Sequence, residues 1–137
     1  MIDEDLQNAY KKAVYRIFKP EISWKVGEHS SELDQLLLQY DVEVATFVTA
    51  CNPHSRLLPA QENAARNTEL RQVLEKREYS YLDGQGEDPQ GHWPAEVSYL
   101  VLDMDEVNAR LLGRQFSQNA VLVITAGQAV RLLFCSD

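Results

Sequence analysis

The segment VEVATFVTAC, residues 42–51, most constrains how this chain can fold. It is rich in β-branched residues, and apolar side chains fall on both alternating faces of the extended chain. A strand that is apolar on both faces must be covered on both faces. The segment therefore predicts a central strand of a sheet with other structure packed on each side.

Short helical and strand-like patterns follow one another along the rest of the chain in the order αββαβαββαββ. This order is too irregular for repeated βαβ units. It predicts one α+β domain over residues 1–137, in which three to four helices pack on a mixed sheet. Helices are expected over residues 4–13, 31–40 and 60–77 and again after residue 103, and strands over residues 14–18, 22–26, 42–51, 79–82, 97–102, 119–124 and 129–134.

Three local signals mark helix starts. Ser30 or Ser31 can cap the second helix, and Pro59 fits the first turn of the third, where its missing N–H costs nothing. Asp103 and Glu106 have the spacing of a capping box, so we expect Asp103 to cap the fourth helix. In that helix Met104, Val107 and Leu111 are expected to face inward, and Phe116 falls on the opposite side.

Composition limits the partners. The chain has 137 residues, of which 21 are acidic and 13 basic, and its formal charge of −8 repels a phosphate backbone. We therefore do not expect nucleic acid as a partner. The two cysteines form no CxxC pair, the start lacks a signal-peptide pattern, and no apolar run approaches the roughly 20 residues of a membrane span. These features predict a soluble, cytoplasmic protein without a membrane partner.

The third expected helix has an anomalous inward face. Its last turns place Leu70, Val73 and Leu74 on one side, which must pack on the sheet. In the first turns the same side carries Glu62, Asn63, Arg66 and Asn67, and Glu62 can pair with Arg66 four residues later. Inward polar groups must be satisfied. The partners are either the protein itself or a ligand in a pocket.

Three further segments could border such a pocket. The turn with Asn52 and Ser55 precedes a helix start, which favours an anion. The Gly-rich loop at 83–96 is either an ordinary hairpin connection or a flap that carries Trp93, with Glu96 at the start of the next strand. GRQFSQNA, residues 113–120, supplies Arg114 and Asn119, which also suit an ordinary helix terminus.

Other chemistries have weaker support. Cys51, His54 and His92 are too few and too scattered to predict a metal site, and Cys51 with His54 does not make a nucleophile and base pair. No helix opens directly after the glycines of the 83–96 loop, so both nucleotide-binding fingerprints are excluded. We expect no metal and no cofactor.

Four motifs together resemble a bacterial family catalogued as domain of unknown function 3293. They are TACNPHS at 49–55, ENAARN at 62–67, GQGEDPQGHWPAEVSYLVL at 84–102 and GRQFSQNA at 113–120. Their order and spacing match the pattern of that family over most of the chain. The resemblance implies a small bacterial domain without an established activity, and it transfers no catalytic residue.

Two functions follow from these patterns. The first is a domain that binds a small polar or anionic ligand at the corner between the central strand and the third helix, with or without catalysis. The second is a protein-interaction or regulatory module whose polar motifs are structural; RNA binding is disfavoured by charge. The candidate ligand-binding residues are Asn52, Ser55, Glu62, Asn63, Arg66, Asn67, Trp93, Glu96, Arg114 and Asn119.

Overall fold

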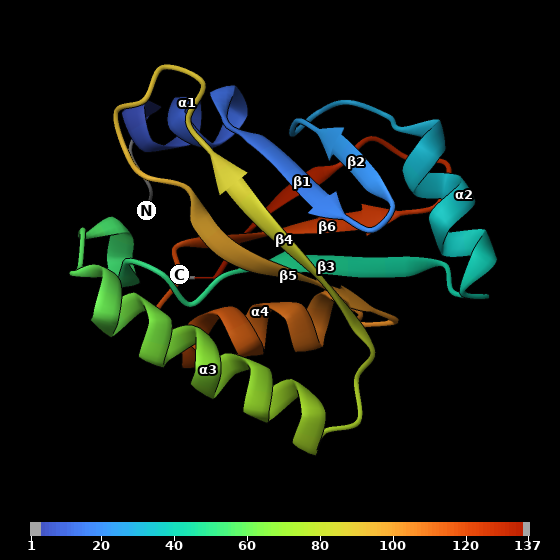
Figure 1. Ribbon diagram of the computed structural model, residues 1–137. Helices are drawn as coiled ribbons and strands as arrows, with labels where there is room; N and C mark the ends of the chain where they lie inside the picture. The colour runs from blue at the N-terminus through green and yellow to red at the C-terminus, as the bar shows by residue number, and fades with distance from the viewer. Residues whose placement is uncertain (1–3, 136–137) are drawn as a thin grey trace.

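The computed structural model describes residues 4–135, and its helices and strands follow the predicted order. The α+β class is confirmed (Figure 1). A short 3-10 turn, η1, lies between the third strand of the sheet and the third helix. The elements are α1 Glu4–Lys12, β1 Val14–Phe18, β2 Glu21–Trp24, α2 Ser31–Gln39, β3 Val44–Val48, η1 Pro53–Ser55, α3 Ala60–Lys76, β4 Tyr81–Glu87, β5 Glu96–Leu102, α4 Glu106–Gln115, β6 Ala120–Thr125 and β7 Arg131–Phe134.

The strands form one sheet in the order β2-β1-β4-β5-β3-β6-β7. Every strand pairing among the described residues is antiparallel, whereas the sequence had predicted a mixed sheet. The reason is that β1–β2, β4–β5 and β6–β7 are hairpins, whose two strands must run in opposite directions. The β1–β4, β3–β5 and β3–β6 pairings, which join the hairpins and β3 into one sheet, are antiparallel as well.

The β3 strand is central and covered on both faces, as its sequence predicts. Ala45 and Phe47 belong to one buried cluster, which includes residues of β1, β2 and α2. Val48 belongs to a second cluster on the opposite face, with residues of α3 and α4. Figure 1 shows α3 and α4 together on one face of the sheet, with α1 and α2 near its two ends on the other side. None of the helices over residues 4–135 is long and apolar enough to cross a membrane.

The sheet is strongly curled. The centroids of the Trp24 ring of β2 and the Phe47 ring of β3 are 5.1 Å apart, although β1, β4 and β5 separate those strands within the sheet. Gly84 allows this curl, since a Cβ atom there would lie 2.3 Å from the carbonyl oxygen of Arg16 and 2.9 Å from the Phe47 ring. The β4 strand extends to Glu87, beyond the predicted end at residue 82, because Gly84 and Gly86 pair with β1 and β5.

The start of α4 differs from the prediction. Asp105, not Asp103, caps the helix, and its side chain accepts a hydrogen bond from the Asn108 amide. Asp103 remains attached to the sheet, because its amide donates to the carbonyl oxygen of Val44 at 2.9 Å. Of the three residues expected to face inward from this helix, Met104 is buried but precedes the helix. The prediction is wrong for Val107 and Leu111, which are 70% and 55% exposed.

Different residues form the inward face of α4. They are Ala109, Leu112 and Gly113. Phe116, which the helical wheel placed on the opposite side, is also buried because the helix ends at Gln115.

We expect Gly84→Ala to lower the free energy of unfolding by about 1 to 3 kcal/mol, because the added methyl group overpacks a closed contact. Gly86→Ala is the matched control. Its Cβ would lie 3.4 Å from the Tyr15 ring, which is close to ordinary contact distance. Urea denaturation of both variants measures the difference. Equal stabilities for the two variants would contradict the close approach at Gly84.

Candidate functional site

The polar face of α3 binds the backbone of the segment that leaves β3. The Asn67 side chain accepts a hydrogen bond from the Ala50 amide at 2.9 Å, and Asn63 accepts one from the Asn52 amide at 2.8 Å. The Arg66 guanidinium donates to the Ala50 carbonyl oxygen at 2.6 Å. Backbone groups that have left the sheet thus find their partners on a helix, which accounts for the polar inward face.

The segment at 113–120 meets the same corner. Arg66 also donates to the carbonyl oxygen of Phe116, and Gln118 donates to that of Cys51 at 3.0 Å. Asn119 donates to the Ser55 hydroxyl at 2.8 Å. The two polar clusters identified in the sequence therefore lie in contact.

Glu62 does not share this arrangement. Its side chain is exposed, although the helical wheel placed it inward, and it forms no ion pair with Arg66 among the described residues. Asn63, Arg66 and Asn67 do face inward. Successive side chains of a helix are about 100° apart, so Glu62 lies at the margin of the face on which Asn63 and Asn67 lie, and it points to solvent.

The Asn52 side chain links this network to a carboxylate. Its Oδ1 accepts from the Leu58 amide at 2.9 Å and from Asn63 Nδ2 at 2.8 Å. Its Nδ2 donates to Glu96 Oε2 at 2.7 Å. Because two donors occupy the oxygen, the amide has one orientation, with its nitrogen toward Glu96. Asn52 also adopts a left-handed backbone conformation, φ 50°, which asparagine tolerates better than most residues.

A cavity of about 330 Å³ lies on the concave side of the sheet, next to Asn52. Helix α1, the 88–95 loop and the 52–57 turn contribute to its walls together with the strands. Figure 1 shows α1 and this loop at the same end of the sheet. The lining residues are Leu6, Ala9, Tyr10, Ala13, Tyr15, Phe47, Thr49, Cys51, Asn52, Ser55, Leu57, Gly86, His92, Trp93, Glu96, Ser98, Gln118, Ala120, Val121 and Leu122.

Glu96 places a carboxyl group in this mostly apolar wall. Burial raises the pKa of Glu96, and the hydrogen bond from Asn52 lowers it by a smaller amount. Of its two side-chain oxygens, Oε2 accepts from Asn52, and no donor within residues 4–135 is in hydrogen-bonding range of Oε1. Among the described residues, Glu96 is thus held by one side-chain hydrogen bond, and no lysine or arginine lines the cavity.

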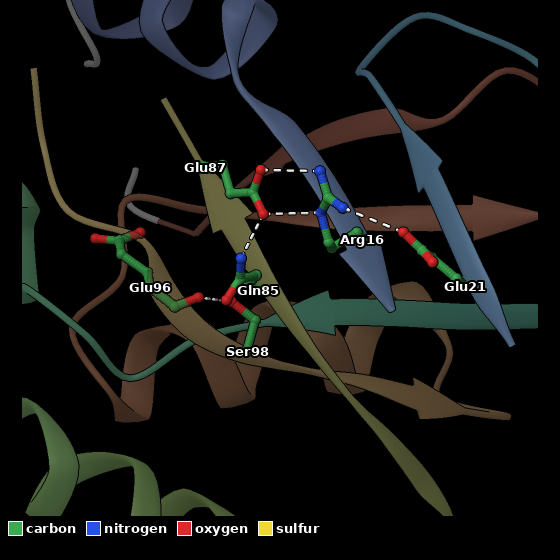
Figure 2. A network of polar contacts seen from close by, with 6 residues as sticks. All are labelled: Arg16, Glu21, Gln85, Glu87, Glu96 and Ser98. Atoms are coloured by element: carbon green, nitrogen blue, oxygen red, sulfur yellow. Dashed lines mark hydrogen bonds and ion pairs between the residues drawn. The ribbon is translucent and has the colours of Figure 1, made fainter. Parts of the chain in front are cut away.

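Glu87 on the neighbouring strand has the opposite environment. Its carboxylate forms a bidentate ion pair with Arg16, with 2.7 Å between Arg16 Nε and Glu87 Oε2. Figure 2 shows Glu87 facing Arg16 while the Glu96 side chain lies apart from that pair. The strand register explains the difference. Arg16 pairs with Gln85 on one face of the sheet, whereas Glu96 pairs with Gly86 and shares the cavity face.

The other acidic groups of the cavity wall also favour their neutral forms. Burial raises the pKa of Tyr10 to about 12, although a hydrogen bond with Ser55 lowers it in part. Burial likewise raises the pKa of Tyr15 and of the Cys51 thiol, and the charge of Glu96 adds to both shifts. A raised pKa leaves little thiolate at neutral pH, so Cys51 is a poor nucleophile.

The predicted site residues fall into two groups. Asn52, Ser55, Trp93 and Glu96 line the cavity. The others lie outside its wall, in the hydrogen-bonded network or on the surface. They are Glu62, Asn63, Arg66, Asn67, Arg114, whose guanidinium donates to the carbonyl oxygen of Cys135, and Asn119.

Sequence reasoning missed most of the apolar and aromatic wall. In the helix predicted over residues 4–13, Leu6, Tyr10 and Ala13 fall on one face, and the sequence pattern assigned no function to that face. In the structure no residue of α1 is fully buried, and its inward face borders the cavity. The signal was therefore present in the sequence, but a face that lines a cavity has the same pattern as one that packs on a core.

We expect Asn67→Ala to lower the free energy of unfolding by about 1 to 3 kcal/mol, because the Ala50 amide would be left buried without an acceptor. Gln72→Ala is the matched control, since it removes an exposed amide from the same helix. We expect it to change stability by less than about 0.5 kcal/mol. Urea denaturation measures both variants. A small effect of Asn67→Ala would contradict the bracing role of this face.

We expect Glu96→Gln to raise the free energy of unfolding at pH 7. A carboxyl group with a raised pKa stabilises the folded state at low pH, and this contribution is lost as the pH rises through the folded-state pKa. Glutamine carries no charge, so the variant does not lose this stability as the pH rises. The free energies of unfolding of the two proteins should become similar below about pH 4, where glutamate in an unfolded chain is protonated.

Glu87→Gln is the control of opposite sign, because it breaks the ion pair with Arg16 and should lower stability at pH 7 by about 0.2 to 1 kcal/mol. Thermal denaturation between pH 3.5 and about pH 8 gives both curves. A loss of stability in Glu96→Gln that grows with pH would contradict the environment described for Glu96.

Comparison with curated proteins and with solved structures gave no match for this chain. One family model matches residues 48–121, a segment that contains the network on α3 and the cavity residues Asn52 and Glu96. Helix α1 and strand β1, with Tyr10 and Tyr15, lie outside the matched segment. The match covers more than half of the chain, which therefore belongs to the family described as Protein of unknown function (DUF3293).

Proposed function

We propose that this protein binds a small molecule in the cavity between α1, the 88–95 loop and the concave face of the sheet, with Glu96 as the polar anchor. The observation that carries the proposal is the carboxyl group of Glu96, oriented by Asn52 within a mostly apolar cavity of about 330 Å³. Ligand pockets commonly have this size and combine an apolar wall with a few oriented polar groups.

The division of roles among the polar residues supports the proposal. Thr49, Ser98 and Gln118 line the cavity, and each already donates a hydrogen bond to a backbone carbonyl oxygen. Glu96 differs from them, since its Oε1 accepts from no donor in the described part of the chain. A partly buried carboxyl group with an open acceptor costs free energy of folding, and binding sites often retain such groups.

The polar face of α3 has a supporting role in this proposal. Asn63, Arg66 and Asn67 brace the corner and fix Asn52, and they do not contact the ligand. The ligand would contact Glu96, Ser55 and Trp93 from the predicted set, together with the Tyr10 and Tyr15 side chains.

A neutral probe and a cavity-filling variant test the proposal. We expect 2-phenylethanol to shift the amide resonances of cavity-lining residues in ¹⁵N-¹H NMR spectra, with a dissociation constant in the millimolar range that is typical of small fragments. In Ala120→Leu the added side chain occupies the cavity, and these shifts should disappear.

The matched control is Ala45→Leu, which adds the same side chain at a buried position outside the cavity wall, in the cluster that contains Phe47 and Leu122. It should lower the free energy of unfolding by about 1 to 3 kcal/mol but preserve the shifts. Identical shifts in Ala120→Leu would refute binding in this cavity, as would a wild-type protein that shows no shifts with the alcohol or with probes of the same body and other charge.

A further inference from the structure

The charges of the cavity wall indicate the kind of ligand that it would accept, an inference that rests on the proposed binding function. Glu96 is the single aspartate or glutamate among the lining residues of the described chain, and no lysine or arginine lines the cavity. The two arginines among the predicted site residues bind backbone groups outside the cavity. Arg66 binds two backbone carbonyl oxygens, and Arg114 binds that of Cys135.

The groups that face Glu96 disfavour added negative charge. The Tyr10 and Tyr15 hydroxyls and the Cys51 thiol are held in their neutral forms by burial and by the charge of Glu96. An anionic ligand would meet the same desolvation and the same repulsion. A cation would instead remove the cost of an unpaired carboxylate in the wall.

His92 is the one histidine among the described lining residues, and it lies at the cavity margin. Its side chain is 75% exposed, and its ring nitrogen lies 3.7 Å from the Asp88 carboxylate. Solvent therefore screens any positive charge on His92, and the Asp88 carboxylate partly neutralises it. Glu96 remains the dominant charge in the interior of the cavity.

Aromatic rings add a second attraction for cations. Tyr10, Tyr15, Phe47 and Trp93 all line the cavity, and the Tyr15 and Phe47 rings form an edge-to-face pair at 5.7 Å. The negative face of an aromatic ring attracts a cation, and tryptophan attracts it most strongly. The formal charge of −8 also draws cations toward the protein from a distance.

We propose that the cavity selects small molecules that carry a protonated amine on an apolar body, with Glu96 as the counter-ion and the aromatic wall around the apolar part. The amine would donate to Glu96 Oε1, while Asn52 keeps Oε2 in place. This arrangement gives the ligand a charge-assisted hydrogen bond, which is about twice as strong as a neutral one.

Three probes with a common phenyl body and different head groups test the selectivity. They are 2-phenylethylamine, which is a cation at pH 7, 2-phenylethanol, which is neutral, and 3-phenylpropionate, which is an anion. NMR titration of the full chain should rank the amine first and the anion last. We expect the amine to bind about 10-fold or more tightly than the alcohol, as a hydrogen bond to a charged group warrants.

Two charge variants locate the effect. Glu96→Gln should weaken the amine about 10-fold and leave the alcohol within about twofold. Glu87→Gln removes the same formal charge from the neighbouring strand and should leave both affinities unchanged, because Glu87 faces Arg16 on the other side of the sheet.

The outcomes separate the two proposals. If the alcohol binds but the amine binds no more tightly, or if the anion binds best, the cationic selectivity is refuted while the binding function stands. The selectivity is also refuted if both charge variants weaken the amine equally, because the effect would then be one of net charge. If none of the three probes binds, the proposed binding function itself fails.

Discussion

The site depends above all on the fixed orientation of the Asn52 side-chain amide. Two donors, the Leu58 amide and Asn63, occupy its oxygen, so its nitrogen must point to Glu96. Asn63 is itself positioned by α3, which Arg66 and Asn67 attach to the end of β3. The position of α3 therefore fixes the Asn52 side chain, which in turn positions the Glu96 carboxylate. The residues of such a hydrogen-bonded network stabilise one another.

The polar residues predicted as one site have two different roles in the structure. Asn63, Arg66 and Asn67 satisfy backbone groups at a corner where the chain leaves the sheet, and this role needs no ligand. Glu96 is different because burial opposes its charge, and residues 4–135 supply a single donor, Asn52, to its carboxylate. The contrast with Glu87, which has Arg16 as a bidentate partner one strand away, shows that the fold can neutralise a carboxylate where the sheet register allows it.

Much of this organisation could be predicted from the sequence. The apolar pattern of 42–51 predicted a central strand, and helical periodicity located Asn63, Arg66 and Asn67 on an inward face. The sheet curl could not be predicted, because it depends on the contact of Gly84 with Phe47, two residues far apart in the chain. The curl and α1 create the cavity, so local patterns identified Glu96 and Trp93 but not the Tyr10, Tyr15 and Phe47 rings beside them. The cap of α4 was predicted at Asp103, but the amide of Asp103 donates to the Val44 carbonyl oxygen and keeps that residue on the sheet, so Asp105 caps the helix.

The most direct test is a ¹³C NMR titration of the Glu96 carboxyl carbon, in the wild-type protein and in Asn52→Gly, a variant that keeps the left-handed backbone accessible. We expect a wild-type midpoint above about 4.3, the pKa of glutamate in an unstructured peptide. The midpoint should rise further in Asn52→Gly, because the hydrogen bond from Asn52 lowers the pKa of Glu96. A wild-type midpoint at or below that of the peptide, or one unchanged in the variant, would contradict a buried carboxylate positioned by Asn52.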